Sequence, residues 1–124
     1  MQAGTDGNLW TVGTASGKLV KVEYRTGKIT EFSPPTQDSG PFAVDVDRNR
    51  NFIWFGEMNA RKLGRFDPRS NTFAEFPVPS ADVGGEFSDP RVIWIRVDPQ
   101  KPNRVWWGGG TTPHPKIGYI EVIE

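Results

Sequence analysis

The chain has 124 residues, the size of one ordinary domain, with 15 basic side chains, 15 acidic side chains and no cysteine. A balanced charge gives no field that attracts a polyanion, so neither nucleic acid nor an anionic membrane surface is an expected partner. The lack of cysteine excludes disulfide scaffolds, thiolate catalysis and cysteine-type zinc sites. No apolar run approaches the roughly 18 residues of a membrane span, so membrane insertion is not expected.

Short alternating apolar runs predict β-strands throughout the chain, and no segment has the spacing of a long amphipathic helix. The first unit, residues 5–35, carries three predicted strands, over residues 8–12, 18–24 and 28–32. A turn at Asp6-Gly7 precedes the first strand and a turn at Gly27 separates the last two, because glycine accepts positive φ at little cost. Pro34 and Pro35 end this unit.

Two further units follow. The second, residues 40–79, carries four predicted strands, over residues 42–46, 52–55, 62–66 and 72–76. A proline-, glycine- and serine-rich connection then leads to the third unit, residues 90–124. Its three predicted strands cover residues 92–97, 104–107 and 116–122. The strand count is therefore three, four and three.

The units repeat one another. Residues 18–32 return 44 positions later as residues 62–76 without insertion or deletion, and a third copy starts at Lys116. An apolar residue and a tryptophan precede each copy, which places Trp10, Trp54 and Trp106 at one repeat position. Self-similarity at this period on short strands is typical of propeller blades. We expect the three tryptophans to pack between neighbouring blades.

The predicted fold is all-β, a single domain over residues 1–124 forming a partial β-propeller of about two and a half four-stranded blades. In a blade the first strand lies nearest the central channel. The leading unit is expected to lack this inner strand, and the trailing unit its outer one. Open strand edges and apolar blade faces would invite pairing, so we expect other copies of the chain, or further blades, as partners.

The middle unit carries a resemblance to a known family. Residues 52–68 read FIWFGEMNARKLGRFDP and residues 73–79 read FAEFPVP. These phrases resemble the blade repeat of the streptogramin B (virginiamycin B) lyase family, with partial matches in residues 8–35 and again at residues 116–120. The resemblance implies a seven-bladed ring that opens a cyclic depsipeptide antibiotic by elimination at its ester. It also implies magnesium, with histidine and glutamate at the channel mouth.

Carried over position by position, the resemblance puts Glu57 on the glutamate that follows the Trp-Phe pair. Asn59 and Phe42 stand at or near places where an active blade would carry histidine. An elimination needs a group of suitable pKa to take the proton, and a glutamate without a metal-held partner is a poorer candidate. We therefore predict no catalytic residue and no metal ligand in this chain, with magnesium only in the lyase-like alternative.

Four residues are candidates for ligand binding. Glu57 and Asn59 follow a buried-type strand and could point into the channel, or could bond backbone groups of their loop. Trp94 lies on a predicted inner strand and could line the channel as a stacking surface, or could pack in the core. His114, the only histidine, stands between two prolines on a predicted loop that could reach the channel rim or form a stiff exposed turn.

Three hypotheses for function remain open. The first is a non-enzymatic propeller module that acts as scaffold or binding surface for a peptide, glycan or small molecule. The second is a magnesium-dependent lyase-like or lactonase-like enzyme whose site is completed by missing blades. The third is a fragment or subunit that closes a ring by self-assembly. Members of the wider family imply a secreted or periplasmic location, although residues 1–4 do not resemble a signal peptide.

Overall fold

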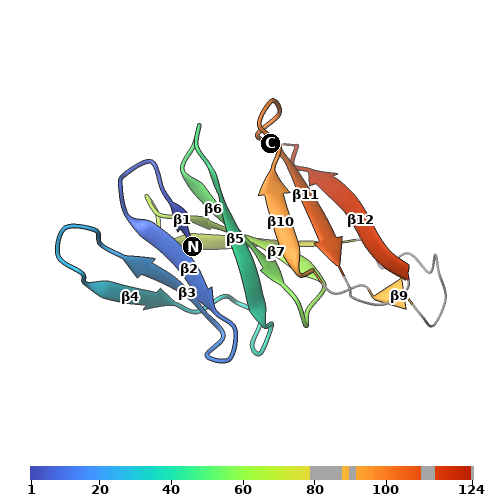
Figure 1. The fold of residues 1–124 in the computed structure, drawn as a ribbon, viewed down its shortest axis with the longest axis horizontal. Helices are drawn as coiled ribbons and strands as arrows, with labels where there is room; N and C mark the ends of the chain where they lie inside the picture. The colour runs from blue at the N-terminus through green and yellow to red at the C-terminus, as the bar shows by residue number, and fades with distance from the viewer. Residues whose placement is uncertain (79–87, 90–91, 110–113, 124) are drawn as a thin grey trace.

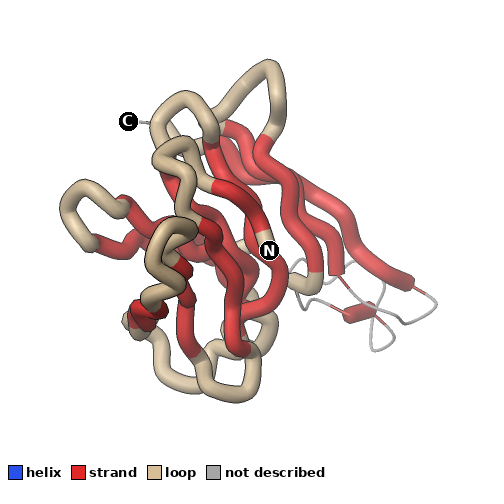
Figure 2. Tube along the Cα trace, turned by 60° about the vertical axis from the view of Figure 1, so that its left-hand side comes forward, coloured by secondary structure: helices blue, strands red, loops and turns tan. Residues whose placement is uncertain are grey.

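The computed structural model describes residues 1–78, 88–89, 92–109 and 114–123. These residues form strands and loops and no helix, as Figure 2 shows, which confirms the all-β prediction. The part of the chain that is described therefore contains no helix able to cross a membrane.

Blade I is a four-stranded antiparallel sheet. Its strands are β1 (Gln2–Ala3), β2 (Leu9–Gly13), β3 (Lys18–Val22) and β4 (Ile29–Phe32), in that order across the sheet. The prediction that this unit lacks an inner strand is corrected, because β1 occupies that position and pairs with β2 through Gln2 and Trp10. A two-residue strand is too short to produce an alternating pattern, so sequence reasoning could not predict it.

Blade II is the complete four-stranded unit that the sequence predicts. It contains β5 (Pro41–Asp47), β6 (Phe52–Glu57), β7 (Lys62–Asp67) and β8 (Thr72–Pro77), all antiparallel. Pairing of β5 with β6 shifts register between Phe42 and Val44. The extra residue, Ala43, has a φ of 60°, which makes this a β-bulge near the start of the inner strand.

Blade III has three antiparallel strands, as predicted: β10 (Trp94–Val97), β11 (Arg104–Gly109) and β12 (His114–Glu121). The outer edge of β12 carries a short addition. Strand β9 (Ser88–Asp89), from the connection between blades II and III, pairs parallel to β12 at His114 and Pro115. The outer position therefore holds a two-residue strand from earlier in the chain.

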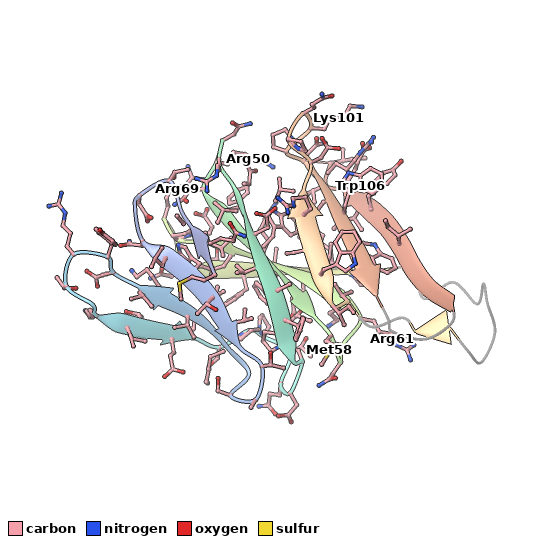
Figure 3. All side chains as sticks on the ribbon, in the orientation of Figure 1. Arg50, Met58, Arg61, Arg69, Lys101 and Trp106 are labelled. Atoms are coloured by element: carbon pink, nitrogen blue, oxygen red, sulfur yellow. The ribbon has the colours of Figure 1, made fainter. Side chains whose placement is uncertain are left out.

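The three sheets lie side by side, with blade II between the other two (Figure 1). The inner strand β5 contacts β1 on one side and β10 on the other, so the inner strands of neighbouring blades converge. Figure 3 marks the two ends of the sheets: Met58 and Arg61 lie at one end, and Arg50, Arg69 and Lys101 lie at the opposite end. We call the first the Glu57 end, because β6 ends there at Glu57.

Tight turns repeat with the same 44-residue period as the strands. Gly17 has a φ of 73° before β3, and Arg61, at the same repeat position before β7, has a φ of 56°. Two other turns repeat the left-handed conformation in both blades, at Gly7 and Asn51 and at Gly27 and Asn71. Blade II thus keeps the turn conformations of blade I but has larger residues in place of the glycines. Of these residues, Arg61 is the least suited to positive φ, because asparagine tolerates the left-handed region better than arginine.

Two hydrophobic cores lie between the sheets. We call the side of each sheet that bears Trp10, Trp54 or Trp106 its tryptophan face, and the other side its reverse face. Trp10 packs with residues from the reverse face of blade II, and its ring centroid lies 5.7 Å from that of Phe66. Trp54 packs in the same way with residues of blade III. Both tryptophans are fully buried, which confirms the prediction for these two.

Trp106 differs from its two counterparts and corrects the prediction. It is half-buried, its ring centroid lies 4.8 Å from that of Tyr119 on the same sheet, and its Nε1 donates to Asp98 Oδ2 at 3.0 Å. The buried tryptophan of blade III is Trp107, on the reverse face, in the core shared with blade II. Trp106 is less buried because no blade among the described residues covers its face.

Candidate functional site

The four predicted site residues all belong to the Glu57 end of blades II and III. Glu57 ends β6, Asn59 follows in the turn to β7, Trp94 begins β10 and His114 begins β12. The register supports this placement, since Pro41 at the start of β5 pairs with Glu57, and Trp94 pairs with Gly108 near the end of β11. The surroundings of these residues differ, since Glu57 is buried and Trp94 is exposed.

Glu57 lies inside the protein. Its side chain has no exposed surface. The Glu75 carboxyl group and the buried Ser39 hydroxyl lie beside it and act on its ionisation. Burying an ionised carboxylate costs free energy, so burial favours the protonated form of Glu57.

The ionisation of Glu57 is linked to that of Glu75. Burial first, and then the Glu75 carboxylate, raise the pKa of Glu57 from 4.5 to about 8. Burial also acts against ionisation of Glu75, but the protonated Glu57, Thr36 and the charge of Lys62 together lower the pKa of Glu75. At neutral pH the pair therefore holds one proton, on Glu57.

Lys62 and Thr36 fix the position of Glu75. The Thr36 hydroxyl donates to Glu75 Oε1 at 2.9 Å and accepts from Lys62 Nζ at 3.0 Å. Lys62 Nζ lies 3.6 Å from Glu75 Oε1, so the two charges form an ion pair. Thr36 belongs to the connection between β4 and β5, so this network ties the linker of two blades to the strands of blade II.

Asn59 makes contacts with its own loop. Its backbone N–H donates to the Ser39 carbonyl at 2.8 Å, and its side-chain Nδ2 donates to the Asp38 carbonyl at 3.4 Å. The amide covers Gly40, which has a φ of 64°; a Cβ added there would lie 2.6 Å from Asn59 Nδ2. Asn59 therefore holds together the entrance to β5.

Trp94 is exposed and positioned by a glycine. Its side chain is 43% exposed, and its indole lies directly over Gly108 of the neighbouring strand. A Cβ at residue 108 would come within 1.9 Å of the ring, so only glycine leaves room for this orientation. One side of the indole rests on backbone, and exposed ring surface remains.

Phe42 is a site residue that sequence reasoning did not select, except as a position where histidine was absent. It pairs with Gly56, just as Trp94 pairs with Gly108, and the two glycines occupy the same place in their blades. Phe42 is 41% exposed. Two inner strands thus present an aromatic ring at the same position. The spacing of the tryptophan repeat could have indicated this equivalence.

His114 is the first residue of β12 and pairs with Ser88, so the prediction that it lies on a loop is corrected. The parallel pairing with β9 makes it part of the sheet. Its side chain lies outside the described residues.

An open groove of about 510 Å³ lies at the other end of the sheets, where β5 and β10 end. Asp45, Arg48 and Arg96 are among the residues that line it. Its carboxylates serve the fold: Asp45 Oδ2 accepts from Val97 N at 2.8 Å, and Asp47 Oδ2 pairs with Arg50 Nε at 2.8 Å.

The residues at the Glu57 end do not fit magnesium. The ammonium group of Lys62 already neutralises Glu75, and Glu57 is protonated at neutral pH, whereas Mg²⁺ requires free oxygen donors. Among the described residues, no group of three or more histidine, cysteine or acidic side chains is arranged to hold a metal ion.

Comparison with known proteins identifies the fold. No family model matches the sequence, and no curated protein matches it significantly. Virginiamycin B lyase from Staphylococcus aureus has the same fold with a TM-score of 0.70 at 22% identity, over 98% of this chain and 40% of that one. A streptogramin B lyase structure gives 0.66 at 21% identity, over 94% of this chain and 37% of that one.

A protein of different activity has the same arrangement. Hydrazine synthase from Kuenenia stuttgartiensis gives a TM-score of 0.75 at 16% identity, over 96% of this chain and 31% of that one. At these identities the comparisons establish the fold alone. This chain spans about 40% of the length of the staphylococcal lyase. The chain is therefore similar in fold to the lyase-like β-propellers, over nearly all of its own length.

Proposed function

We propose that the chain is a non-enzymatic β-propeller module that binds a ring-shaped ligand, an aromatic or sugar ring, where its inner strands meet. The observation that carries this proposal is the exposure of Phe42 and Trp94, 41% and 43%, at equivalent positions of β5 and β10. Exposed aromatic rings cost free energy in water, and a flat ligand face can cover them.

The exposure of these two rings has a different origin from that of Trp106. Blade III already packs against the tryptophan face of blade II, and yet Phe42 on that face stays 41% exposed. Packing a further blade on blade III would accordingly leave Trp94 accessible. The two rings therefore belong to the channel side of the module, where a ligand reaches them in a closed ring.

The same proposal gives the chain a scaffolding role. Among the described residues, nothing covers the tryptophan face of blade III or the reverse face of blade I, and the proposed module is completed when further blades cover these two faces. A completed ring would bring more inner strands to the site and enclose the ligand.

Ligand-observed NMR with a mixture of aromatic fragments and monosaccharides tests the binding proposal. We expect some of these probes to bind the wild type and to lose binding in Trp94→Ala and in Gly108→Ala, which displaces the indole. Tyr24→Ala is the matched control, since Tyr24 is an exposed aromatic residue in a turn away from the inner strands. Binding that is absent, or that is equal in all four proteins, would contradict the proposal.

A lyase-like or lactonase-like enzyme is the second candidate. Glu57 favours it to the extent that its pKa of about 8 suits a general base. Against it, the carboxyl has no exposed surface through which to meet a substrate. We expect no ring opening of a streptogramin B depsipeptide in the presence of magnesium, measured by mass spectrometry; turnover that Glu57→Gln abolishes would establish the enzyme instead.

A further inference from the structure

The tryptophan face of blade III exposes a residue that the other two blades bury. Ile117 occupies the same register position in β12 as Leu19 in β3 and Leu63 in β7. Leu19 and Leu63 are 0% exposed, whereas Ile117 is 69% exposed. Trp106, half-buried beside it, corresponds to the fully buried Trp10 and Trp54. This surface has the composition of a blade interface, and no described part of the chain covers it.

The reverse face of blade I is the other open surface. Ile29 in β4 corresponds to Phe73 in β8, and Val22 in β3 corresponds to Phe66 in β7. In blade II, Phe73 and Phe66 pack at 4.7 Å between ring centroids and belong to the core shared with blade I. In blade I, Ile29 is 64% exposed and Val22 is half-buried. These positions too are built for burial.

The two internal interfaces share one polarity. The tryptophan face of blade I meets the reverse face of blade II, and the tryptophan face of blade II meets the reverse face of blade III. The two open surfaces are therefore the two different halves of one more interface of the same kind. In neither internal interface does a tryptophan face pack on a tryptophan face, or a reverse face on a reverse face. A contact between two copies of the same face is therefore disfavoured.

We propose that two copies of this chain dock head to tail, with the tryptophan face of blade III in each copy covering the reverse face of blade I in the other. The inference takes ring completion, part of the proposed function, as its starting point and names the partner. Each copy contributes three blades. Two copies give a ring of six, within the usual range of about four to eight blades, whereas three copies would give nine.

Charge permits this contact. The chain carries equal numbers of basic and acidic residues, so two copies do not repel each other over long range. At the open tryptophan face, Arg104 and Glu121 neutralise each other through a hydrogen bond from Arg104 Nε to Glu121 Oε1 at 2.9 Å. The apolar centre of the surface is thereby flanked by a satisfied ion pair, as at the rim of many interfaces.

Light scattering on a sizing column tests the proposal with two charge variants, one on each open face. Ile117→Asp alters the tryptophan face of blade III and Ile29→Lys the reverse face of blade I; both side chains are largely exposed, so the single chain should still fold. We expect the wild type at twice the monomer mass at micromolar concentration. Each variant alone should run as a monomer, because both interfaces of its dimer contain the altered face. Tyr24→Asp, in an exposed turn, is the control and should remain dimeric.

Mixing the two variants separates a head-to-tail contact from any other. A mixed dimer has one wild-type interface and one in which aspartate faces lysine, so we expect the dimer to return on mixing. If two copies of the same face formed the dimer, only the variant altered on that face would be monomeric. Adding the other variant would then not restore its dimer. That result, a wild-type monomer, or a larger or open-ended assembly would overturn the proposal. A monomer that still binds ring probes through Trp94 would leave the ligand-binding proposal standing.

Discussion

Glu57 shows how one residue acquires its properties from neighbours distant in the sequence. Its carboxyl group is enclosed at the end of β6, and the charge of Glu75 lies next to it. Lys62 and Thr36 stabilise the charge on Glu75, so the proton of the pair stays on Glu57. The pH dependence of stability should report this arrangement directly.

The free energy of unfolding should fall as the pH rises from 4.5 to about 8. In this window folded Glu57 keeps a proton that the unfolded chain has released, so stability is fully present below 4.5 and is lost as the pH passes the folded pKa. Glu57→Gln, which carries no titrating proton, should flatten the dependence and be the more stable protein at pH values above this window. Urea unfolding across the pH series measures it; parallel curves for the two proteins would contradict the prediction.

Arg61 is a second residue whose conformation makes a prediction. Its φ of 56° is a left-handed value that the same turn in blade I assigns to Gly17, at 73°. Arg61→Gly should stabilise the protein by about 0.5 to 1 kcal/mol, because the glycine adopts this conformation without strain. The converse change Gly17→Arg should destabilise it by about 1 kcal/mol. Equal chemical denaturation midpoints for all three proteins would show that the turn carries no strain.

At the scale of the element, the repeat predicts the blades well and their surroundings poorly. The strands of blade II, and the burial of Trp10 and Trp54, follow from periodicity and repetition alone. Trp106 has the same local sequence pattern and a different environment, because burial depends on the next blade and not on the blade itself. Glu31 and Glu75 are likewise equivalent in sequence, and the contact of Glu75 with Thr36 comes from the linker between blades I and II, which the repeat does not predict.

The site residues show the same limit. The sequence singled out Glu57 and Trp94 from their positions on predicted strands, whereas Ser39 and Thr36 lie in a linker without any pattern. Their contacts form only when the chain brings that linker to the end of β6. The strand β1 was missed because a pair of residues has no periodicity.

Tryptophan truncation should distinguish a closed interface from an open one. Trp54→Ala removes a fully buried ring between two blades and should cost about 3 to 5 kcal/mol of unfolding free energy. Trp106→Ala, measured on the monomeric Ile117→Asp background, should cost clearly less, because the ring is half-buried there. Urea denaturation of both variants makes the comparison. Similar losses would mean that Trp106 is packed as tightly as its counterpart.

For the whole molecule, the described residues form three blades with two buried interfaces and leave two blade faces uncovered. Under the proposed head-to-tail contact a second copy covers these faces, and the stability of the chain becomes a function of its own concentration. In this respect a three-blade module differs from a closed ring, in which every blade has two neighbours.

The melting temperature of the wild type should therefore rise with protein concentration, whereas that of Ile117→Asp should not, since only the former gains from association. Differential scanning calorimetry over a wide dilution series is the measurement. A wild-type melting temperature independent of concentration would indicate that the folded chain draws no stability from a second copy.

Strand β9 covers only one end of the outer edge of blade III. It pairs with β12 only at His114 and Pro115, and no other described strand continues along that edge toward Glu121. The backbone amides and carbonyls of this stretch are therefore a template for an added strand, in the place that β4 and β8 occupy in their own blades. An extended peptide could anneal there, and in a concentrated sample the same edge is where fibrous aggregation would start.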